Sequence, residues 1–471
     1  MGPGAEITRR ASGTAQRCAT AAGHPAVTCA SRRVTAPGAC VSVKALPVGA
    51  HFPDDFTFGV ATSAYQVEGG IENDWSQWER LGKLKEPHAR CGRGVEHWQR
   101  FESDLDLVQE LGVSAYRLSL EWARIEPRFG ELDRAAVDGY RHRLEAMRAR
   151  GIRPIVTLHH FTNPPWLHER TPWHSHEVLG PWRRYAKLCA ELLDGLGAAV
   201  ITFNEPMVFV LGGWLQGVMP PGLTDARLAA AAIENVARAH VIAREELIAR
   251  SKAVTCGISQ HVMVFAPERK WNPFDQALTR IAQENFNHAL LRALTTGELA
   301  LRMPAVISLK RRIDGARDSM EFLGVNYYTR SHLKFVPRPP FAQFGFRDVH
   351  GRGLTDIGWE DYPEGFLQVL KDMKQYRLPV WVTENGIDDR RGDRRPSFIH
   401  RHLKALLDAR AEGVDVRAYL HWSLLDNFEW LEAWGPRFGL YRVDFETLER
   451  TPTPAVPYFR KLATTRELVA P

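Results

Sequence analysis

The stretch Val380-Trp381-Val382-Thr383-Glu384-Asn385-Gly386 decides how the rest of the chain is interpreted. Its β-branched and aromatic residues predict a short buried strand, and Gly386 predicts the end of that strand. Such an apolar run suits a strand covered on both faces, as in a parallel sheet. Loops at the carboxyl ends of parallel strands carry the chemistry of α/β folds, so we expect Glu384 to lie exposed at the strand end as a functional carboxylate.

The length and composition of the chain bound its architecture. With 471 residues, 44% of them hydrophobic, the chain can bury a large core. One large barrel with long loops and an arrangement of two to three smaller domains both fit this length. The 14 tryptophans are expected mostly in the core, with the remainder available as flat platforms for a ring-shaped ligand.

The positive charge is concentrated at the amino terminus. Of the net charge of +6, residues 1–50 hold six basic residues against one acidic residue, a net of +5, which leaves +1 for residues 51–471. A nearly neutral body argues against nucleic-acid and membrane-surface partners. Residues 1–50 are rich in Ala, Gly, Thr and Ser and predict a disordered basic extension. Export through Arg9-Arg10 and an organellar transit peptide remain alternatives, although no apolar stretch of signal-peptide length is present.

The cysteines indicate a reducing compartment. Six cysteines lie far apart without a C-x-x-C pair, so the sequence supports neither a disulfide scaffold nor a zinc site. No run approaches 18 apolar residues, which argues against a transmembrane helix. We therefore expect a cytoplasmic protein that needs no metal and no cofactor.

From Phe52 onward a repeating unit appears, in which an amphipathic helix, a glycine and a short apolar strand follow one another. The glycines are Gly112, Gly151 and Gly197, and the apolar residues before each recur at spacings of three and four. Together with five further candidates this predicts eight strands: Phe56–Ala61, Ser114–Leu120, Pro154–Leu158, Ala199–Phe203, Cys256–Val262, Phe322–Tyr327, Val380–Thr383 and Val416–Trp422.

Eight strands that alternate with helices predict a (β/α)₈ TIM barrel formed by residues 51–471 as a single domain. An open doubly wound sheet is the alternative. It is disfavoured because the G-x-G pairs at Gly92 and Gly351 have neither a strand before them nor a helix after them.

Polar residues follow several of the predicted strands at the rim where a barrel builds its active site. Glu205 follows the fourth strand and Glu384 ends the seventh, so two carboxylates face one mouth, with Asn204 and Asn385 beside them. Cleavage of a glycosidic bond needs such a pair, one acid for the leaving oxygen and one group on the opposite face. A structural ion pair and a metal site with His and Glu ligands remain open as alternatives.

Four motifs resemble glycoside hydrolase family 1, and they occur in the order typical of that family. They are Phe52-Pro53 through Ser63-Ala64-Tyr65-Gln66-Val67-Glu68-Gly69, Thr202-Phe203-Asn204-Glu205-Pro206, Thr383-Glu384-Asn385-Gly386, and Trp422-Ser423-Leu424-Leu425-Asp426-Asn427-Phe428-Glu429-Trp430. The similarity extends from about Phe52 to the carboxyl terminus.

This resemblance implies a retaining β-glycosidase. Glu205 would be the general acid/base, and Glu384 the nucleophile that forms the glycosyl-enzyme. Arg117 and Tyr328 would hydrogen-bond the nucleophile, with Asn326 as further catalytic support. Retention requires carboxyl groups about 5 Å apart, close enough that the charge of Glu384 would raise the pKa of Glu205 in the free enzyme.

The resemblance also assigns residues to the sugar. Gln66, His160, Asn204, Glu429 and Trp430 match positions that hold the hydroxyls, Trp422 matches the platform beneath the ring, and Trp359 matches an aromatic that faces the aglycone. Core or rim packing is the alternative for each, and it explains a tryptophan more readily than a Gln, His or Glu at a strand end.

The expected substrate is a small unphosphorylated β-D-glucoside cleaved from its terminus, with some activity on β-galactosides and β-fucosides. Glu429 would repel a 6-phosphate, and a glutamate at position 205, where thioglucoside-cleaving relatives have glutamine, favours O-glycosides. The alternatives are a different sugar preference and a non-catalytic sugar- or partner-binding protein of the same fold. The sequence leaves open the aglycone, the balance of hydrolysis and transglycosylation, and the oligomeric state. A histidine-rich segment, His159 to His176, invites a metal site but has no Cys or Asp at ligand spacing.

Overall fold

The computed structural model describes residues 50–471 except 252, 305 and 339–341. The extension predicted for residues 1–50 lies outside the described residues, apart from Ala50. Ala50 belongs to the folded unit, because β1 (Ala50–His51) pairs antiparallel with β17 (Glu467–Leu468) near the carboxyl terminus. Within the described part of the chain, no helix is both long enough and apolar enough to cross a membrane.

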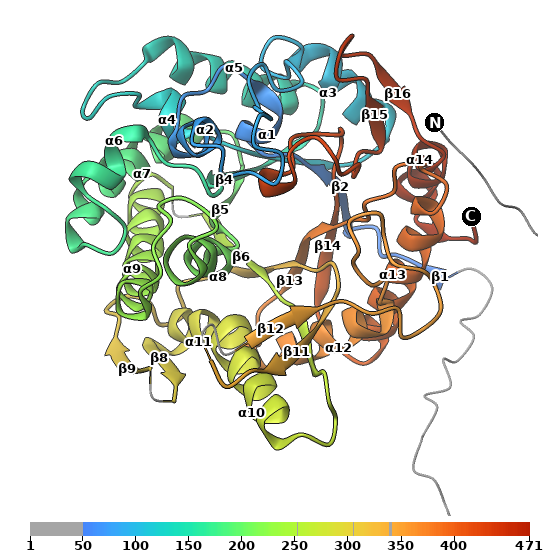
Figure 1. Ribbon diagram of the computed structural model, residues 1–471. Coiled ribbons are helices and arrows are strands. Elements are labelled where there is room, and N and C mark those ends of the chain that lie inside the picture. Colours follow the sequence, from blue (N-terminus) through green and yellow to red (C-terminus); the bar gives the residue numbers. More distant parts are fainter. Residues whose placement is uncertain (1–49, 252, 305, 339–341) are drawn as a thin grey trace, which may run out of the picture. The chain divides into compact units, whose positions relative to one another are not determined.

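Eight parallel strands close into a barrel, which confirms the predicted (β/α)₈ fold (Figure 1). The order around the barrel is β10-β13-β14-β2-β3-β4-β5-β6, so the chain runs once around the ring. The strands are β2 (Thr57–Ala61), β3 (Ala115–Ser119), β4 (Arg153–His159), β5 (Ala199–Asn204), β6 (Thr255–His261), β10 (Phe322–Asn326), β13 (Val380–Asn385) and β14 (Val416–Trp422). Each lies where the sequence predicts a strand, with ends that differ by no more than two residues.

Helices surround the ring of strands and alternate with them (Figure 1). The main ones are α3 (Phe101–Glu110), α5 (Arg134–Ala149), α7 (Leu179–Leu193), α9 (Ala226–Arg250), α11 (Ala289–Thr296), α12 (Pro363–Met373), α13 (Arg395–Ala411) and α14 (Ala455–Thr465). Gly112, Gly151 and Gly197, which follow the first three, have φ of 67°, 73° and 60°. Only glycine adopts this left-handed conformation without strain, so Gly112 and Gly151 stop α3 and α5 directly after their capping residues. Helix α7 instead stops at Gly195, with φ of 75°, two residues before the predicted Gly197.

Shorter helices and strands lie in the connections between the barrel strands and the main helices. They include α1 (Ala64–Glu68), α2 (Asp74–Arg80), α4 (Trp122–Ile125), α6 (Pro165–Arg170), α8 (Pro206–Val210) and α10 (Pro273–Ala282). A small sheet joins β7 (Val264–Pro267), β11 (Arg330–Phe335) and β12 (Ala342–Gly345), and two hairpins pair β8 (Glu298–Met303) with β9 (Ile307–Arg312) and β15 (Tyr441–Val443) with β16 (Arg450–Pro452).

The barrel interior is apolar at one end and polar at the other. Its apolar end is a cluster of inward-facing side chains in which Phe322 stacks on Trp381 with ring centroids 4.2 Å apart. Along β3 the inward positions run from Ala115 in that cluster to Arg117, which is fully buried. The apolar cluster therefore fills the amino-terminal half of the barrel, and the polar groups are left to the carboxyl ends of the strands.

Two register irregularities turn the expected side chains toward the barrel axis. In β13 the pairing with β10 passes from Val325–Val382 to Asn326–Glu384, so one residue of β13 is skipped. In β5 the pairing with β6 shifts between Ile201 and Asn204. A bulge of this kind re-aims the next side chain. Glu384 and Asn204 thus face inward, although strict alternation along each strand would point them outward.

Candidate active site

Glu384 lies within β13, which continues to Asn385, and its side chain is buried rather than exposed as the sequence suggested. Both of its oxygens accept hydrogen bonds. Arg117 Nη1 donates to Oε1 at 2.5 Å, and the Tyr328 hydroxyl donates to Oε2 at 2.7 Å. The fully buried guanidinium of Arg117 also donates to Thr157 Oγ1 at 3.0 Å and to Asn204 Oδ1 at 2.7 Å. These contacts fix the position of Glu384 and favour its ionised form.

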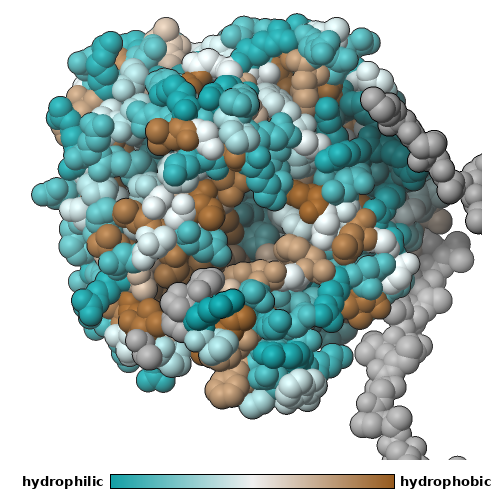
Figure 2. Space-filling view, in the orientation of Figure 1, coloured by the Kyte–Doolittle hydropathy of each residue, from teal (hydrophilic) through white to brown (hydrophobic). Residues whose placement is uncertain are grey.

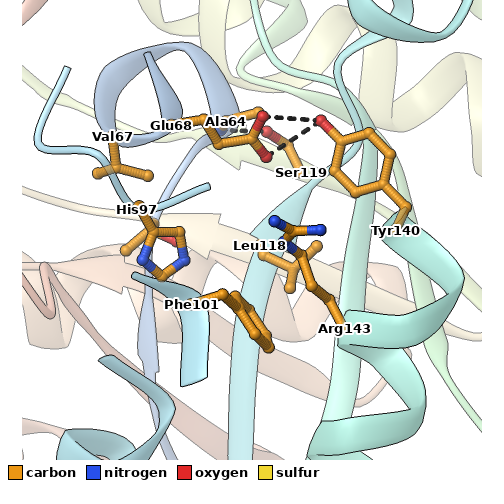
Figure 3. Close-up of a pocket in the computed structure, with 10 residues that line it drawn as sticks. Ala64, Val67, Glu68, His97, Phe101, Leu118, Ser119, Tyr140 and Arg143 are labelled. Carbon is orange, nitrogen blue, oxygen red and sulfur yellow. Dashed lines mark hydrogen bonds between the residues drawn. The ribbon is translucent and has the colours of Figure 1, made fainter. Parts of the chain in front are cut away.

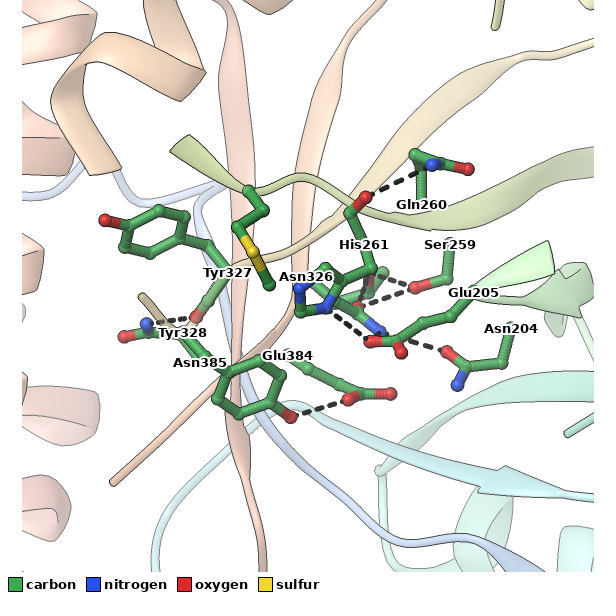
Figure 4. Close-up of polar contacts among 12 residues, drawn as sticks. Asn204, Glu205, Ser259, Gln260, His261, Asn326, Tyr327, Tyr328, Glu384 and Asn385 are labelled. Atoms are coloured by element: carbon green, nitrogen blue, oxygen red, sulfur yellow. Dashed lines mark hydrogen bonds and ion pairs between the residues drawn. The ribbon is translucent and has the colours of Figure 1, made fainter. Parts of the chain in front are cut away.

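Glu205 follows β5 at the start of α8 and is also buried. Its φ of 43° is unusual for a residue other than glycine, and strain of this kind concentrates at functional sites. Asn326 Nδ2 donates to Glu205 Oε1 at 2.8 Å, and the imidazole Nδ1 of His261 lies 3.1 Å from the same oxygen. Figure 4 shows these contacts, with the carboxylate of Glu384 directed into the same space.

The pKa values of the two carboxyl groups differ from the sequence-based expectation. Burial favours a raised pKa for Glu205, but the charge and hydrogen bond of His261, the hydrogen bond of Asn326 and the charge of Arg117 outweigh it, so the pKa of Glu205 is lowered. Burial raises the pKa of Glu384 to about 7, with Arg117 opposing and the charge of Glu205 adding to the rise. The resemblance implied a raised pKa for Glu205. The structure differs because His261, which the sequence analysis does not consider, contacts Glu205 and lowers its pKa.

Gln66 and Glu429 contact each other beside Glu205 and Glu384. Gln66 Nε2 lies 3.3 Å from Glu429 Oε2 and 2.9 Å from the carbonyl oxygen of Phe428, and Gln66 Oε1 accepts from the Ser63 hydroxyl at 2.6 Å. Burial, together with the charges of Glu384, Asp388 and Glu205, raises the pKa of Glu429 well above its ordinary value. Burial is the largest cause, and the three neighbouring carboxyl groups add to it.

His160 carries a hydrogen-bonding atom without a protein partner. Its ring lies parallel to Trp422 and Trp430, with centroids 6.1 and 6.0 Å away, and Nε2 accepts from Asn204 Nδ2 at 3.1 Å. Burial lowers its pKa well below the usual value, so the imidazole is neutral and its proton resides on Nδ1. Nδ1 is buried and has no hydrogen-bond partner among the described residues. An unpaired buried donor costs stability unless a ligand accepts from it.

The remaining predicted residues divide into two groups. Trp422 packs with Tyr328 and Phe438 next to the carboxylates, and Trp359 packs against the outer side of that cluster, 5.5 Å from the Tyr328 ring. Asn385 does not join the site. Its amide donates to the Tyr327 carbonyl and accepts from the Tyr419 hydroxyl, so it holds neighbouring strands together.

Sequence reasoning missed His261 and the residues that hold Asn326. Ser259 and Thr383 hydroxyls each donate to Asn326 Oδ1 at 2.7 Å and thereby point the amide of Asn326 at Glu205. His261 ends β6 at the same rim of the barrel. The rule that polar strand ends form the site would have found it.

The histidine-rich segment makes separate protein contacts instead of a metal cluster. His159 bonds Asn163 at 3.1 Å, His168 bonds Asp74 at 2.9 Å, and His174 accepts from the Trp214 indole at 3.0 Å. Among the described residues, no group of three or more His, Cys, Asp or Glu side chains is arranged to hold a metal ion.

A second cavity lies between α1, β3 and α5 (Figure 3). It is lined by Glu68, His97, Tyr140 and Arg143 among others and has a volume of about 10 Å³. That volume holds no more than one water molecule. The face of the barrel in Figure 2, by contrast, is hollowed at the centre of the ring of strands.

Comparisons with known proteins agree with this geometry. The family described as Glycosyl hydrolase family 1 matches residues 48–468. β-Glucosidase A of Thermotoga maritima is 32% identical over 424 residues, covering 85% of this chain and 94% of that protein. The β-galactosidase of Pyrococcus woesei is 30% identical over 505 residues, covering 89% and 97%. A solved structure of a β-glycosidase from Pyrococcus horikoshii superposes with a TM-score of 0.83 at 35% identity, covering 90% of this chain and 97% of that one. The resemblance in the four motifs is thus confirmed, and the chain belongs to glycosyl hydrolase family 1.

Proposed function

We propose that this protein is a retaining exo-β-glycosidase that hydrolyses terminal β-D-glucosides, with accessory activity on β-D-galactosides and β-D-fucosides. The observation that carries the proposal is a pair of buried carboxylates with different partners. Glu384 has both oxygens held by Arg117 and Tyr328, whereas in the described part of the chain Glu205 has only Oε1 held, by Asn326 and His261. One group suits a fixed nucleophile and the other suits proton transfer.

In the first step Glu384 attacks the anomeric carbon of the sugar, and a carbon–oxygen ester bond forms. Glu205 gives its proton to the glycosidic oxygen, the bond from that oxygen to the anomeric carbon breaks, and the aglycone leaves as an alcohol. Arg117 keeps Glu384 ionised before the attack, against the burial that raises its pKa.

In the second step water hydrolyses the ester. The negative charge of Glu384 is absent from the intermediate, and Glu205, now ionised, removes a proton from water as its oxygen bonds to the anomeric carbon. The ester bond breaks and Glu384 recovers its electron pair. Two inversions at the anomeric carbon give a β-sugar product, and both steps use side chains and water alone.

The groups around the pair favour a neutral sugar. The unpaired Nδ1–H of His160 can donate to a hydroxyl, and Trp422 and Trp430 flank it with apolar faces. The charges that raise the pKa of Glu429 would equally oppose a phosphate group on the sugar. Glu429 and Gln66 can bond either epimer of a 4-hydroxyl, which supports accessory activity on galactosides.

A glutamate at position 205 supports O-glycosides, because an acid must protonate a poor leaving oxygen. Trp359, on the outer side of the cluster, would face the aglycone. We place the enzyme in the cytoplasm because the three described cysteines, Cys91, Cys189 and Cys256, are buried free thiols.

A panel of 4-nitrophenyl β-glycosides, compared by kcat/KM, tests the substrate. We expect the glucoside to be hydrolysed, with the fucoside and galactoside also turned over and 6-phosphoglucosides inert. Proton NMR of the first product tests the mechanism, and the β-anomer should appear before mutarotation. An initial α-anomer, or a 6-phosphoglucoside preferred over glucoside, would contradict the proposal.

A further inference from the structure

His261 ends β6 and points at the proposed acid/base. Its backbone pairs with Asn326 of β10 across the barrel sheet, so two neighbouring strands deliver their last side chains to Glu205 together. The His261 and Glu205 side chains are 9% and 10% exposed, and Nδ1 and Oε1 are 3.1 Å apart. At this burial a contact between an imidazole and a carboxylate is little screened by water.

The two carboxylate oxygens of Glu205 differ in their hydrogen bonds. Oε1 takes both protein contacts, from Asn326 Nδ2 at 2.8 Å and His261 Nδ1 at 3.1 Å. Oε2 has no hydrogen bond to any residue that the structure describes. Since Asn326 already donates to Oε1, Nδ1 of His261 acts there as a second donor. A proton carried by Glu205 is therefore directed to Oε2.

Packing fixes the orientation of the imidazole. The ring stacks on Tyr328 with centroids 5.9 Å apart and planes inclined by 17°, and Phe286 meets it edge-on at 5.9 Å. Tyr328 in turn holds Glu384 through its hydroxyl. The ring that holds the acid/base thus packs on the side chain that holds the nucleophile.

Several charged or titratable groups bear on Glu205. His261 reaches it from β6, Arg117 from β3 and Glu384 from β13, and Tyr328 and Glu429 follow β10 and β14. Arg117 is bonded to Glu384, and Glu384, Tyr328 and Glu429 make no hydrogen bond to Glu205 among the described residues. The only titratable side chain bonded directly to Glu205 within the described part of the chain is His261.

We propose that His261 is the positioning residue of the acid/base: its Nδ1–H holds Oε1 of Glu205, confines the transferred proton to Oε2, and stabilises the ionised carboxylate that acts as base in the second step. The inference rests on the proposed function. The proton leaves Oε2 for the glycosidic oxygen in the first step and returns to Oε2 from water in the second, so the cycle is balanced without a further reactant.

Two substitutions test the N–H donor and the aromatic ring of His261 separately. His261→Phe keeps a ring against Tyr328 and Phe286 but removes the N–H. His261→Asn places an amide donor near the position of Nδ1 and removes the titratable ring. Circular dichroism and thermal melting confirm that each variant is folded before its kinetics are compared.

Loss of the donor should raise the pKa of Glu205, with consequences of definite sign. In His261→Phe the limb of the kcat/KM profile that reports ionisation of Glu205, measured with a poor leaving group such as methyl β-D-glucoside, should move up by roughly one pH unit. With 2,4-dinitrophenyl β-D-glucoside, chosen so that hydrolysis of the ester limits kcat, kcat should fall on the acid side of the profile, approaching roughly tenfold below the pKa of Glu205, because less Glu205 is ionised to act as base. His261→Asn should recover most of both effects.

His97→Asn is the matched control. His97 Nδ1 lies 2.8 Å from Asp104 Oδ2 in another buried pair and makes no hydrogen bond to Glu205 or Glu384 among the described residues. This variant should therefore melt at a lower temperature while the pH profiles of kcat/KM and kcat stay in place. If His261→Phe lowers activity equally on the two substrates and leaves both pH profiles unshifted, His261 is only a packing residue and the inference fails.

A readout independent of turnover separates this inference from the proposed function. In protein labelled with [δ-¹³C]glutamate, the Glu205 carboxyl resonance is assigned by its loss in Glu205→Gln and titrated in wild type and in His261→Phe. A higher pKa in His261→Phe supports the contact even if the wild type hydrolyses no glycoside, in which case only the proposed function fails. An unchanged pKa overturns the inference whatever the activity.

Discussion

Replacing Tyr328 by Phe removes one oxygen atom from the proposed nucleophile site. The hydroxyl donates to Glu384 Oε2 at 2.7 Å, while Arg117 holds the other oxygen. The ring itself remains, with its contacts to His261 and Trp359. The variant therefore tests one hydrogen bond with little disturbance of packing.

The size of the effect follows from the environment of Glu384. Burial raises the pKa of Glu384 to about 7, and the hydrogen bond from Tyr328 is among the contacts that lower it. A hydrogen bond to a charged group contributes about 1.5–3 kcal/mol, part of which persists with the protonated acid. A net loss of about 1.4 kcal/mol raises the pKa by about one unit.

The sign is fixed by the chemistry, because only ionised Glu384 can attack. Below the pKa of Glu384, kcat/KM depends on the small fraction of the enzyme in which Glu384 is ionised. In Tyr328→Phe the pKa of Glu384 should rise by roughly one unit, which lowers kcat/KM about tenfold more at pH 6 than at pH 9.

The assay is kcat/KM for 4-nitrophenyl β-D-glucoside between pH 4.5 and pH 9. Tyr327→Phe is the control, since its hydroxyl donates to the Tyr362 carbonyl at 2.7 Å and not to Glu384. That variant should melt earlier with an unmoved pH profile. A loss of kcat/KM in Tyr328→Phe that is the same at pH 6 and at pH 9, or a pH dependence that changes equally in both variants, would refute the assignment of Tyr328 to the nucleophile.

Four further outcomes are expected. Glu384→Gly should lose hydrolysis of 4-nitrophenyl β-D-glucoside, and added azide should restore turnover as the inverted α-glucosyl azide; a β-product would rule out Glu384 as nucleophile. Glu121, buried with one oxygen unpartnered and its pKa raised by burial to about 8, stays protonated in the folded state while the unfolded chain ionises above about pH 4.5. Stability is therefore lost as the pH rises toward 8, and the melting temperature of Glu121→Gln should exceed that of wild type increasingly over this range; a constant difference would contradict the raised pKa. Trp359→Ala should lower kcat/KM for aryl glucosides by about two- to tenfold but leave methyl β-D-glucoside almost unaffected, and equal losses would remove Trp359 from the aglycone site. Removal of residues 1–47 should leave kcat/KM unchanged, because the family match begins at residue 48, and lost activity in a folded product would show otherwise.

Much of the fold could be predicted because its signals are local. Left-handed Gly112 and Gly151 end α3 and α5 as predicted, Gly195 rather than Gly197 ends α7, and the apolar runs that follow are strands of the barrel. The site could be predicted in outline for a related reason. Once parallel strands close into a ring, their carboxyl ends meet, so Glu205 and Glu384 had to share one end of the barrel.

The sequence by itself determined the number of strands, their order and the family, since periodicity, glycines and motifs are properties of neighbouring residues. Only the tertiary structure decided which way the side chains point and what holds them. Alternation along Val380–Asn385 would turn Glu384 away from the axis, and the irregular pairing with β10 turns it inward, toward Arg117 and Tyr328. The pairing of His261 with Glu205 depends on β6 lying beside β5, which no local pattern encodes. The pKa values depend on burial and on charges from distant parts of the chain, and for that reason the expected order of the two carboxyl groups had to be revised.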